Sequence, residues 1–151
     1  MDFTEFQKIK SKIPKSVNIL AVSKGFESQK IKTLNNLGQD DFGESKFQEA
    51  FEKQLSLKEL NKLRWHFIGN IQSNKIKKIV QNFQFIHSVD SYEKLKKISI
   101  AASQEMKNPK LMLQVKFLND PNKGGFNPDS LRDNWIEIHR IKNVNIVGLM
   151  T

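Results

Sequence analysis

The 151-residue sequence contains no cysteine, so disulfide frameworks, thiolate metal sites and cysteine nucleophiles are excluded. A chain without cysteine fits the reducing cytoplasm, which is the location we expect. No apolar run approaches the roughly 20 residues of a membrane span, and residues 1–15 lack the long apolar segment of a secretory signal. These features predict no membrane partner.

The sequence also lacks the patterns that would identify a metal site or a nucleic-acid-binding surface. Its three histidines and its acidic residues show no metal-ligand spacing, so we expect no metal. The formal net charge is +9, but most basic residues are lysines scattered through helical patterns such as "KIKKIV" and "KLKKI". Such lysines usually mark solvated helix faces. Without a basic and aromatic recognition element, the charge does not predict specific nucleic-acid binding.

Short apolar runs alternate with stretches of helical period along the whole chain, which is the pattern of a βα repeat. The predicted strands are residues 17–22, 41–43, 65–68, 85–89, 111–116 and 145–150. The apolar positions of the predicted helices are Phe3, Phe6, Ile9 and Ile13; Ile31, Leu34 and Leu37; Phe47, Ala50, Phe51 and Leu55; Ile76, Ile79, Val80 and Phe83; Leu95, Ile98, Ala102 and Met106; and Leu131, Trp135, Ile138 and Ile141.

Continuous apolar strands favour a parallel sheet covered by helices, either a β/α barrel or an open doubly wound sheet. The turn after the first strand reads "SKGFES" and lacks the glycine-rich loop that binds dinucleotide phosphates, which favours the barrel. We therefore predict an α/β fold of the (β/α)₈ type in one domain, residues 1–151. About six βα units are present, so the last units of a closed barrel are expected to be missing. Residues 119–130 are expected to form the longest loop.

Lys24 is the first candidate for chemistry, because "AVSKG" places a lysine directly after an apolar strand. Its amine should lie at the carboxyl end of the sheet, partly shielded from water. Partial desolvation favours the neutral amine, which is a nucleophile for aldehydes, so a Schiff base is one interpretation. The other is a lysine that extends from the strand end into solvent.

Two further segments contain candidate site residues. In "FGES", Gly43 permits a tight strand exit and Glu44 begins a helix, where an acidic residue often only complements the helix dipole. In "WHFIGNIQSNK", either Ser73 or Asn74 is a plausible helix N-cap, and the adjacent amides could equally hold an anion. His66, within an apolar strand, is more typical of a hydrogen-bonded core histidine than of a ligand.

Several segments together resemble the pyridoxal phosphate homeostasis protein family. They are "AVSKG", "FGESKFQEA", "WHFIGNIQSNK", "IHSVDS", "NKGGF" and "GLMT", in the family's order. The resemblance implies a (β/α)₈ barrel similar to the barrel domain of alanine racemase, without its second domain. It also implies that Lys24 holds pyridoxal 5′-phosphate (PLP) as an internal aldimine. Members are regarded as regulators of vitamin B6 and amino-acid balance, without established catalytic turnover.

The resemblance implies further cofactor neighbours by motif position: Glu44, His66, Asn70 and Met150 would line the mouth of the barrel. Neighbouring positions differ from the family pattern, with Gly25 where threonine is commoner and Asn70 where histidine is frequent. Family members continue past "GLMT" with a "GMS" loop and a final "RIG" segment, and the resemblance implies that these two segments hold the phosphate and the pyridine nitrogen. Residues 1–151 contain neither segment. Implied partners are PLP and, through it, PLP-dependent enzymes or regulatory proteins.

Two alternatives stay open at this point. A barrel without its last units would expose two strand edges and could act as an interaction module, a monomer or a weakly self-associating chain that has lost stable PLP binding. A PLP-dependent racemase would need an acid or base on the opposite face of the cofactor ring. In the racemases that group comes from the extra domain or the partner chain, so we expect no catalytic residue and no enzyme activity here.

Overall fold

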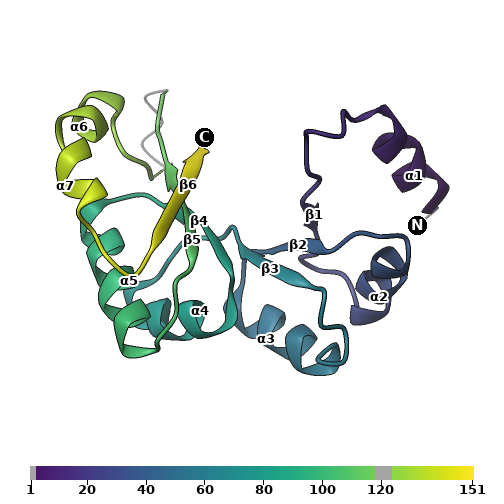
Figure 1. The fold of residues 1–151 in the computed structure, drawn as a ribbon. Coiled ribbons are helices and arrows are strands. Elements are labelled where there is room, and N and C mark those ends of the chain that lie inside the picture. The colour runs from purple at the N-terminus through teal and green to yellow at the C-terminus, as the bar shows by residue number, and fades with distance from the viewer. Residues whose placement is uncertain (1–2, 118–123) are drawn as a thin grey trace.

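The computed structural model describes residues 3–117 and 124–151. Helices and strands alternate along the described chain, as the sequence predicts (Figure 1). The strands are β1 (Ala21–Val22), β2 (Asp41–Glu44), β3 (Arg64–Phe67), β4 (Phe85–Val89), β5 (Lys110–Gln114) and β6 (Asn145–Met150). The helices are α1 (Phe3–Lys12), α2 (Ser28–Asn36), α3 (Phe47–Ser56), the 3₁₀ turn η1 (Ser73–Lys75), α4 (Ile76–Asn82), α5 (Tyr92–Gln104), α6 (Pro128–Asp133) and α7 (Trp135–His139).

All six strands form one parallel sheet in the order β1-β2-β3-β4-β5-β6. Each strand therefore neighbours the next one along the chain, which is the strand order of a β/α barrel rather than of a doubly wound sheet. Figure 1 shows the sheet curving between β1 at one end and β6 at the other. The predicted α/β barrel-type architecture is confirmed, as six parallel strands that alternate with helices in an open, partial barrel.

The hydrophobic core lies between the sheet and its helices. Alternate residues of the central strands point into it, including Phe42, Ile86, Leu111 and Leu113, each 0% exposed. The helices contribute the apolar side chains that the 3.6-residue period marks, such as Ile98 of α5. Because all the paired strands run parallel, the carboxyl ends of the six strands lie along one edge of the sheet.

The two outer strands leave apolar side chains uncovered within the described residues. On β1, Val22 is 45% exposed, and on β6, Val147 and Leu149 are 43% and 56% exposed. Each outer strand pairs on one side only among the described residues. Self-association through these edges remains a prediction.

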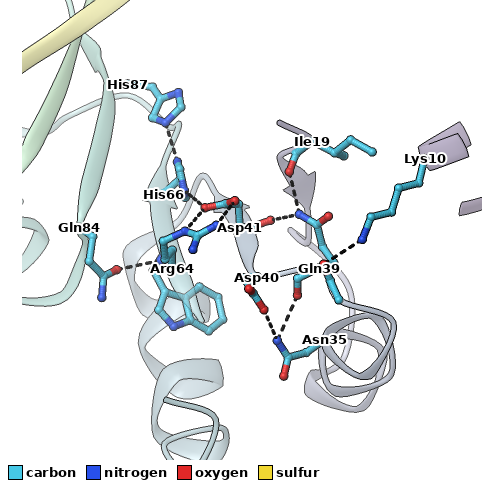
Figure 2. Close-up of polar contacts among 12 residues, drawn as sticks. Lys10, Ile19, Asn35, Gln39, Asp40, Asp41, Arg64, His66, Gln84 and His87 are labelled. Carbon is cyan, nitrogen blue, oxygen red and sulfur yellow. Dashed lines mark hydrogen bonds and ion pairs between the residues drawn. The ribbon is translucent and has the colours of Figure 1, made fainter. Parts of the chain in front are cut away.

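The first strand is shorter than predicted, since residues 17–20 make no strand ladder and only Ala21–Val22 pair with β2. In place of strand hydrogen bonds, the side chain of Gln39 connects this segment to β2. The Gln39 Nε2 donates to the carbonyl oxygens of both Ile19 and Asp41 at 2.7 Å, as Figure 2 shows. Gln39 is 4% exposed, so this amide ties the segment before β1 to β2 from within the protein.

Three local predictions are wrong. Glu44 ends β2 and does not begin a helix; the helix starts at Phe47. Neither Ser73 nor Asn74 is an N-cap, because both lie inside η1, which has no side-chain cap. Met106 lies beyond the end of α5, is 93% exposed and has φ 52°, so the chain leaves the helix before the apolar period ends.

The predicted loop at residues 119–130 lies partly outside the described residues, which resume at Gly124. Its last residues, 128–130, instead begin α6, where the Asn127 side chain accepts a hydrogen bond from the Asp129 backbone at 2.9 Å. Among the described helices, none is both long and apolar enough to cross a membrane.

Candidate cofactor site at the carboxyl ends of the strands

Lys24 lies in a tight turn directly after β1. The Ser23 N–H donates to the Gly43 carbonyl at 3.0 Å, and the Phe26 N–H donates back to the Ser23 carbonyl at 3.1 Å. Gly25 completes the turn with φ 75°, a left-handed conformation that favours glycine. The Lys24 side chain is exposed, and no described residue bonds its amine.

The expectation that Lys24 would be partly shielded is therefore wrong for the described residues. The expectation treated its strand as an interior one, whereas β1 has β2 as its one neighbour in the described sheet. Its place at the carboxyl edge of the sheet is as predicted. The amine is open to a ligand approaching this edge.

A buried polar cluster lies beneath the Lys24 turn. The Glu44 carboxylate, 0% exposed, accepts from the Ser23 hydroxyl and from the Lys53 ammonium, both at 2.7 Å. Both bonds use Oε1, and Oε2 has no partner among the described residues. Glu44 thus supports the turn through Ser23 and Lys53, and its contact with a ligand stays a prediction.

Lys53, on α3, is 6% exposed and bonds three acceptors. Besides Glu44, its Nζ donates to the Ser23 carbonyl at 2.7 Å and to Glu49 Oε1 at 2.6 Å. The same Glu49 oxygen accepts from the Gly25 N–H at 2.5 Å. These hydrogen bonds from Lys53 and Gly25 hold the pKa of the Glu49 carboxyl below its usual value.

His66 belongs to a second polar network, which Figure 2 shows. Its Nε2 lies 2.9 Å from Asp41 Oδ1 and its Nδ1 lies 2.8 Å from His87 Nε2. Arg64 donates two hydrogen bonds of 2.6 Å to the Asp41 carboxylate. Because Asp41 accepts, neutral His66 carries its proton on Nε2, and His87 then donates to His66 Nδ1.

Burial lowers the pKa of both histidines. For His87 the pKa falls to about 4, through desolvation first and then through repulsion from His66. For His66 desolvation also dominates, although the adjacent Asp41 opposes it. His66 is thus a hydrogen-bonded core histidine, and its ring nitrogens face Asp41 and His87 rather than the mouth of the sheet.

Asn70 and Met150 do meet, in a cavity of about 380 Å³ at the carboxyl ends of β3 to β6. The other polar side chains lining it are Ser88, Asp90, Lys94 and Gln114. Lys94 Nζ donates to Asp90 Oδ2 at 2.7 Å and lies 3.4 Å from Asn70 Oδ1. Of the five predicted site residues, the structure brings these two together in the cavity, and Lys24, Glu44 and His66 do not line it.

Sequence reasoning missed the supporting residues of this edge. Lys53 occurs in "FEKQLS", which reads as a solvated helix face, and no spacing signal connects it to Glu44. Ser88 and Asp90 were present in the quoted "IHSVDS" segment, directly after an apolar strand, so their position at a strand end was a usable signal. Among the described residues, no cluster of histidine and acidic side chains could hold a metal ion.

Comparison with known proteins agrees with this fold. The sequence model described as alanine racemase, N-terminal domain, matches residues 4–151. The structure also superposes on alanine racemase of Clostridium difficile with a TM-score of 0.75 over 97% of this chain, at 15% identity, a likeness of fold alone. The class is thus the β/α barrel domain of the alanine racemase N-terminal type.

More similar relatives narrow the class. A pyridoxal phosphate homeostasis protein of Synechocystis is 38% identical over 97% of this chain and 67% of its own length, and one of Pseudomonas aeruginosa is 36% identical over 91% and 59%. PipY of Synechococcus elongatus, solved without PLP, matches with a TM-score of 0.96 at 40% identity over 99% of this chain and 70% of PipY. The chain belongs to the pyridoxal phosphate homeostasis protein family.

The chain is shorter than these relatives. It spans 67% of the Synechocystis protein, 59% of the Pseudomonas aeruginosa protein and 70% of PipY. PipY has also been solved with PLP bound, and that structure matches with a TM-score of 0.92 at 37% identity.

Proposed function

We propose that this protein binds PLP through Lys24 and serves intracellular PLP homeostasis and amino-acid balance, without catalytic turnover of its own. The observation that carries the proposal is the exposed amine of Lys24, which is unpaired among the described residues and lies at the carboxyl edge of the sheet. The related protein PipY has been solved with PLP bound. PLP supplies an aldehyde, with which a neutral lysine amine condenses to a C=N bond with release of water.

The residues around Lys24 fit this role. No described side chain competes for the Lys24 amine, and Lys53 and Glu44 fix the turn that presents it. The polar cavity lined by Asn70 and Met150 lies along the same edge and can orient a polar ligand. Neither His66 nor Glu44 lines that cavity. We therefore propose that these two residues stabilise the surrounding structure, through Asp41 and through the Lys24 turn.

A carrier, unlike a racemase, needs no acid or base on the opposite face of the cofactor ring. A carrier delivers its cofactor to PLP-dependent enzymes in the cytoplasm, the partners and location that we propose. An amino-acid racemase would instead exchange the substrate α-proton with solvent, which can be followed by NMR in deuterated water. We expect no exchange above the background of free PLP.

The test is borohydride trapping of the cofactor. The purified chain is incubated with PLP, reduced with borohydride, digested and mapped by mass spectrometry. We expect the adduct on Lys24 in the wild type and its loss in Lys24→Ala, whereas Lys62→Ala, which removes an exposed lysine away from this edge, leaves it unchanged. Equal labelling of the wild type and Lys24→Ala would contradict the proposal.

The uncovered apolar side chains of β1 and β6 favour a second candidate, an interaction module. In that case the chain self-associates or binds a protein through these edges and does not retain PLP. Sedimentation velocity over a range of concentrations separates the candidates. A monomer that retains PLP after desalting supports the carrier, and an oligomer that retains none supports the module.

A further inference from the structure

We propose that Lys53 is a positioning residue that aims the Lys24 side chain and excludes itself from the reaction with the aldehyde. The inference rests on the proposed function, because it assigns a task to Lys24. It adds a second lysine that the motifs do not single out. In this role Lys53 acts through the backbone around Lys24 and not on the cofactor itself.

The geometry shows how Lys53 acts on Lys24 through the backbone. The carbonyl of Ser23 belongs to the peptide group just before Lys24, and Lys53 Nζ donates to it at 2.7 Å. The N–H of Gly25 belongs to the peptide group just after Lys24, and it donates to Glu49 Oε1, which Lys53 holds at 2.6 Å. Lys53 thus anchors the peptide groups on both sides of Lys24.

Fixing both peptide groups fixes the backbone dihedral angles of Lys24, because only those angles connect the two planes. The direction of the Cα–Cβ bond follows from them, so the flexible lysine side chain starts from one defined point. The glycine at position 25 permits this turn, since its φ of 75° is one that other residues rarely adopt. A side chain on a fixed turn samples fewer positions before it meets a bound aldehyde.

The same contacts separate the two lysines chemically. An ammonium group has three N–H bonds, and Lys53 uses all three, toward Ser23, Glu44 and Glu49. Forming a C=N bond would replace these donors at a nitrogen that is also shielded by burial. Lys24 makes no such bonds with the described residues and is exposed, so the aldehyde finds one reactive amine at this turn.

The experiment uses the absence of native cysteine. A Lys53→Cys variant is alkylated while unfolded, with bromoethylamine in one sample and bromoethane in the other, and then refolded. The aminoethyl side chain has the length and charge of lysine, and the ethyl side chain has a similar stem without the ammonium. Two readouts follow: amide hydrogen exchange at Gly25 by NMR, and borohydride trapping of PLP on Lys24.

We expect Gly25 exchange to be about 10- to 100-fold faster in the ethyl form, the change that corresponds to losing a hydrogen bond to a charged group. Trapping on Lys24 should fall by about tenfold at limiting PLP, and the aminoethyl form should restore both. Equal values in the two refolded forms would overturn the inference, and so would trapping on Lys53 in the wild type.

If the ethyl form fails to refold, Glu49→Gln keeps the inference testable, because Glu49 lies at the edge of the cluster with 31% of its side chain exposed. Glu52→Gln is the matched control, an exposed glutamate on the same helix that contacts Gln48 instead. Faster Gly25 exchange and weaker trapping should appear in Glu49→Gln alone, and no difference between the two variants would refute the role. If the wild type traps no PLP, the proposed function fails while Gly25 exchange still decides the anchoring.

Discussion

Acidification should destabilise this protein through the buried pair His66 and His87. The structure fixes His87 as a donor to His66, whose other nitrogen donates to Asp41. A proton added to His66 Nδ1 would place two donors face to face, and a proton added to His87 would place a charge in a desolvated site. The groups that face this pair are Asp41 from β2 and Arg64 from β3, and the Lys110 ammonium of β5 lies over the adjacent Phe85 ring.

The pKa of His87 sets the sign and size of the effect. Burial lowers this pKa from 6.5 to about 4, so between these values the unfolded chain binds the proton and the folded chain does not. The free energy of unfolding therefore falls as the pH falls through this window, and this group adds no dependence well above pH 6.5. At 1.36 kcal/mol per pH unit, about 2 kcal/mol is lost between pH 7 and pH 5 from His87 alone.

His66 adds to the loss in the same direction, because burial lowers its pKa as well. Asp41 also has a lowered pKa, but its contribution is lost below its ordinary value of 3.8, outside this range. The assay is urea unfolding followed by circular dichroism from pH 7.5 to pH 5. His87→Gln, which keeps a polar partner for His66 but cannot titrate, should flatten the dependence.

The exposed His139 provides the control, and His139→Gln should retain the wild-type slope. A free energy of unfolding that stays constant from pH 7 to pH 5, or rises, would refute the reasoning. So would an unchanged slope in His87→Gln.

Glycine substitutions at three positions test the backbone geometry of the site. Gly25→Ala should lower the free energy of unfolding by about 1–2 kcal/mol, the cost of a left-handed conformation for a residue with a Cβ; no loss in urea unfolding would show that φ 75° is not required. Gly69→Ala should cost more than Gly148→Ala, because a Cβ at 69 would lie 2.0 Å from the Ser45 carbonyl oxygen whereas one at 148 meets nothing within 4 Å. Similar unfolding midpoints for these two variants would contradict the close approach of the β2 and β3 exits.

Strand and helix order could be predicted from the sequence because periodicity reports local burial. The strands at 85–89 and 145–150 agree with the predicted bounds to the residue. The first strand does not, because its length depends on a partner and on the Gln39 amide, neither of which the apolar run "VNILAV" encodes. The local apolar pattern thus predicts which segments form strands and helices, whereas tertiary contacts determine where those segments begin and end.

The candidate site was predictable only in part, for a related reason. Lys24 and Asn70 follow apolar strands, so their place at the carboxyl edge followed from the topology. The orientation of the Glu44 side chain could not be predicted in this way, because the side of the sheet on which a strand residue lies depends on register and packing. Glu44 faces Lys53 on α3. Lys53 is buried and bonded to three acceptors, but the sequence around it does not distinguish it from a solvent-exposed lysine.

Borohydride trapping of PLP tests the central claim most directly. In the wild type, the account predicts one reduced adduct, mapped to Lys24 and absent from Lys24→Ala. An adduct of equal yield in both proteins, or no adduct in the wild type, would contradict it.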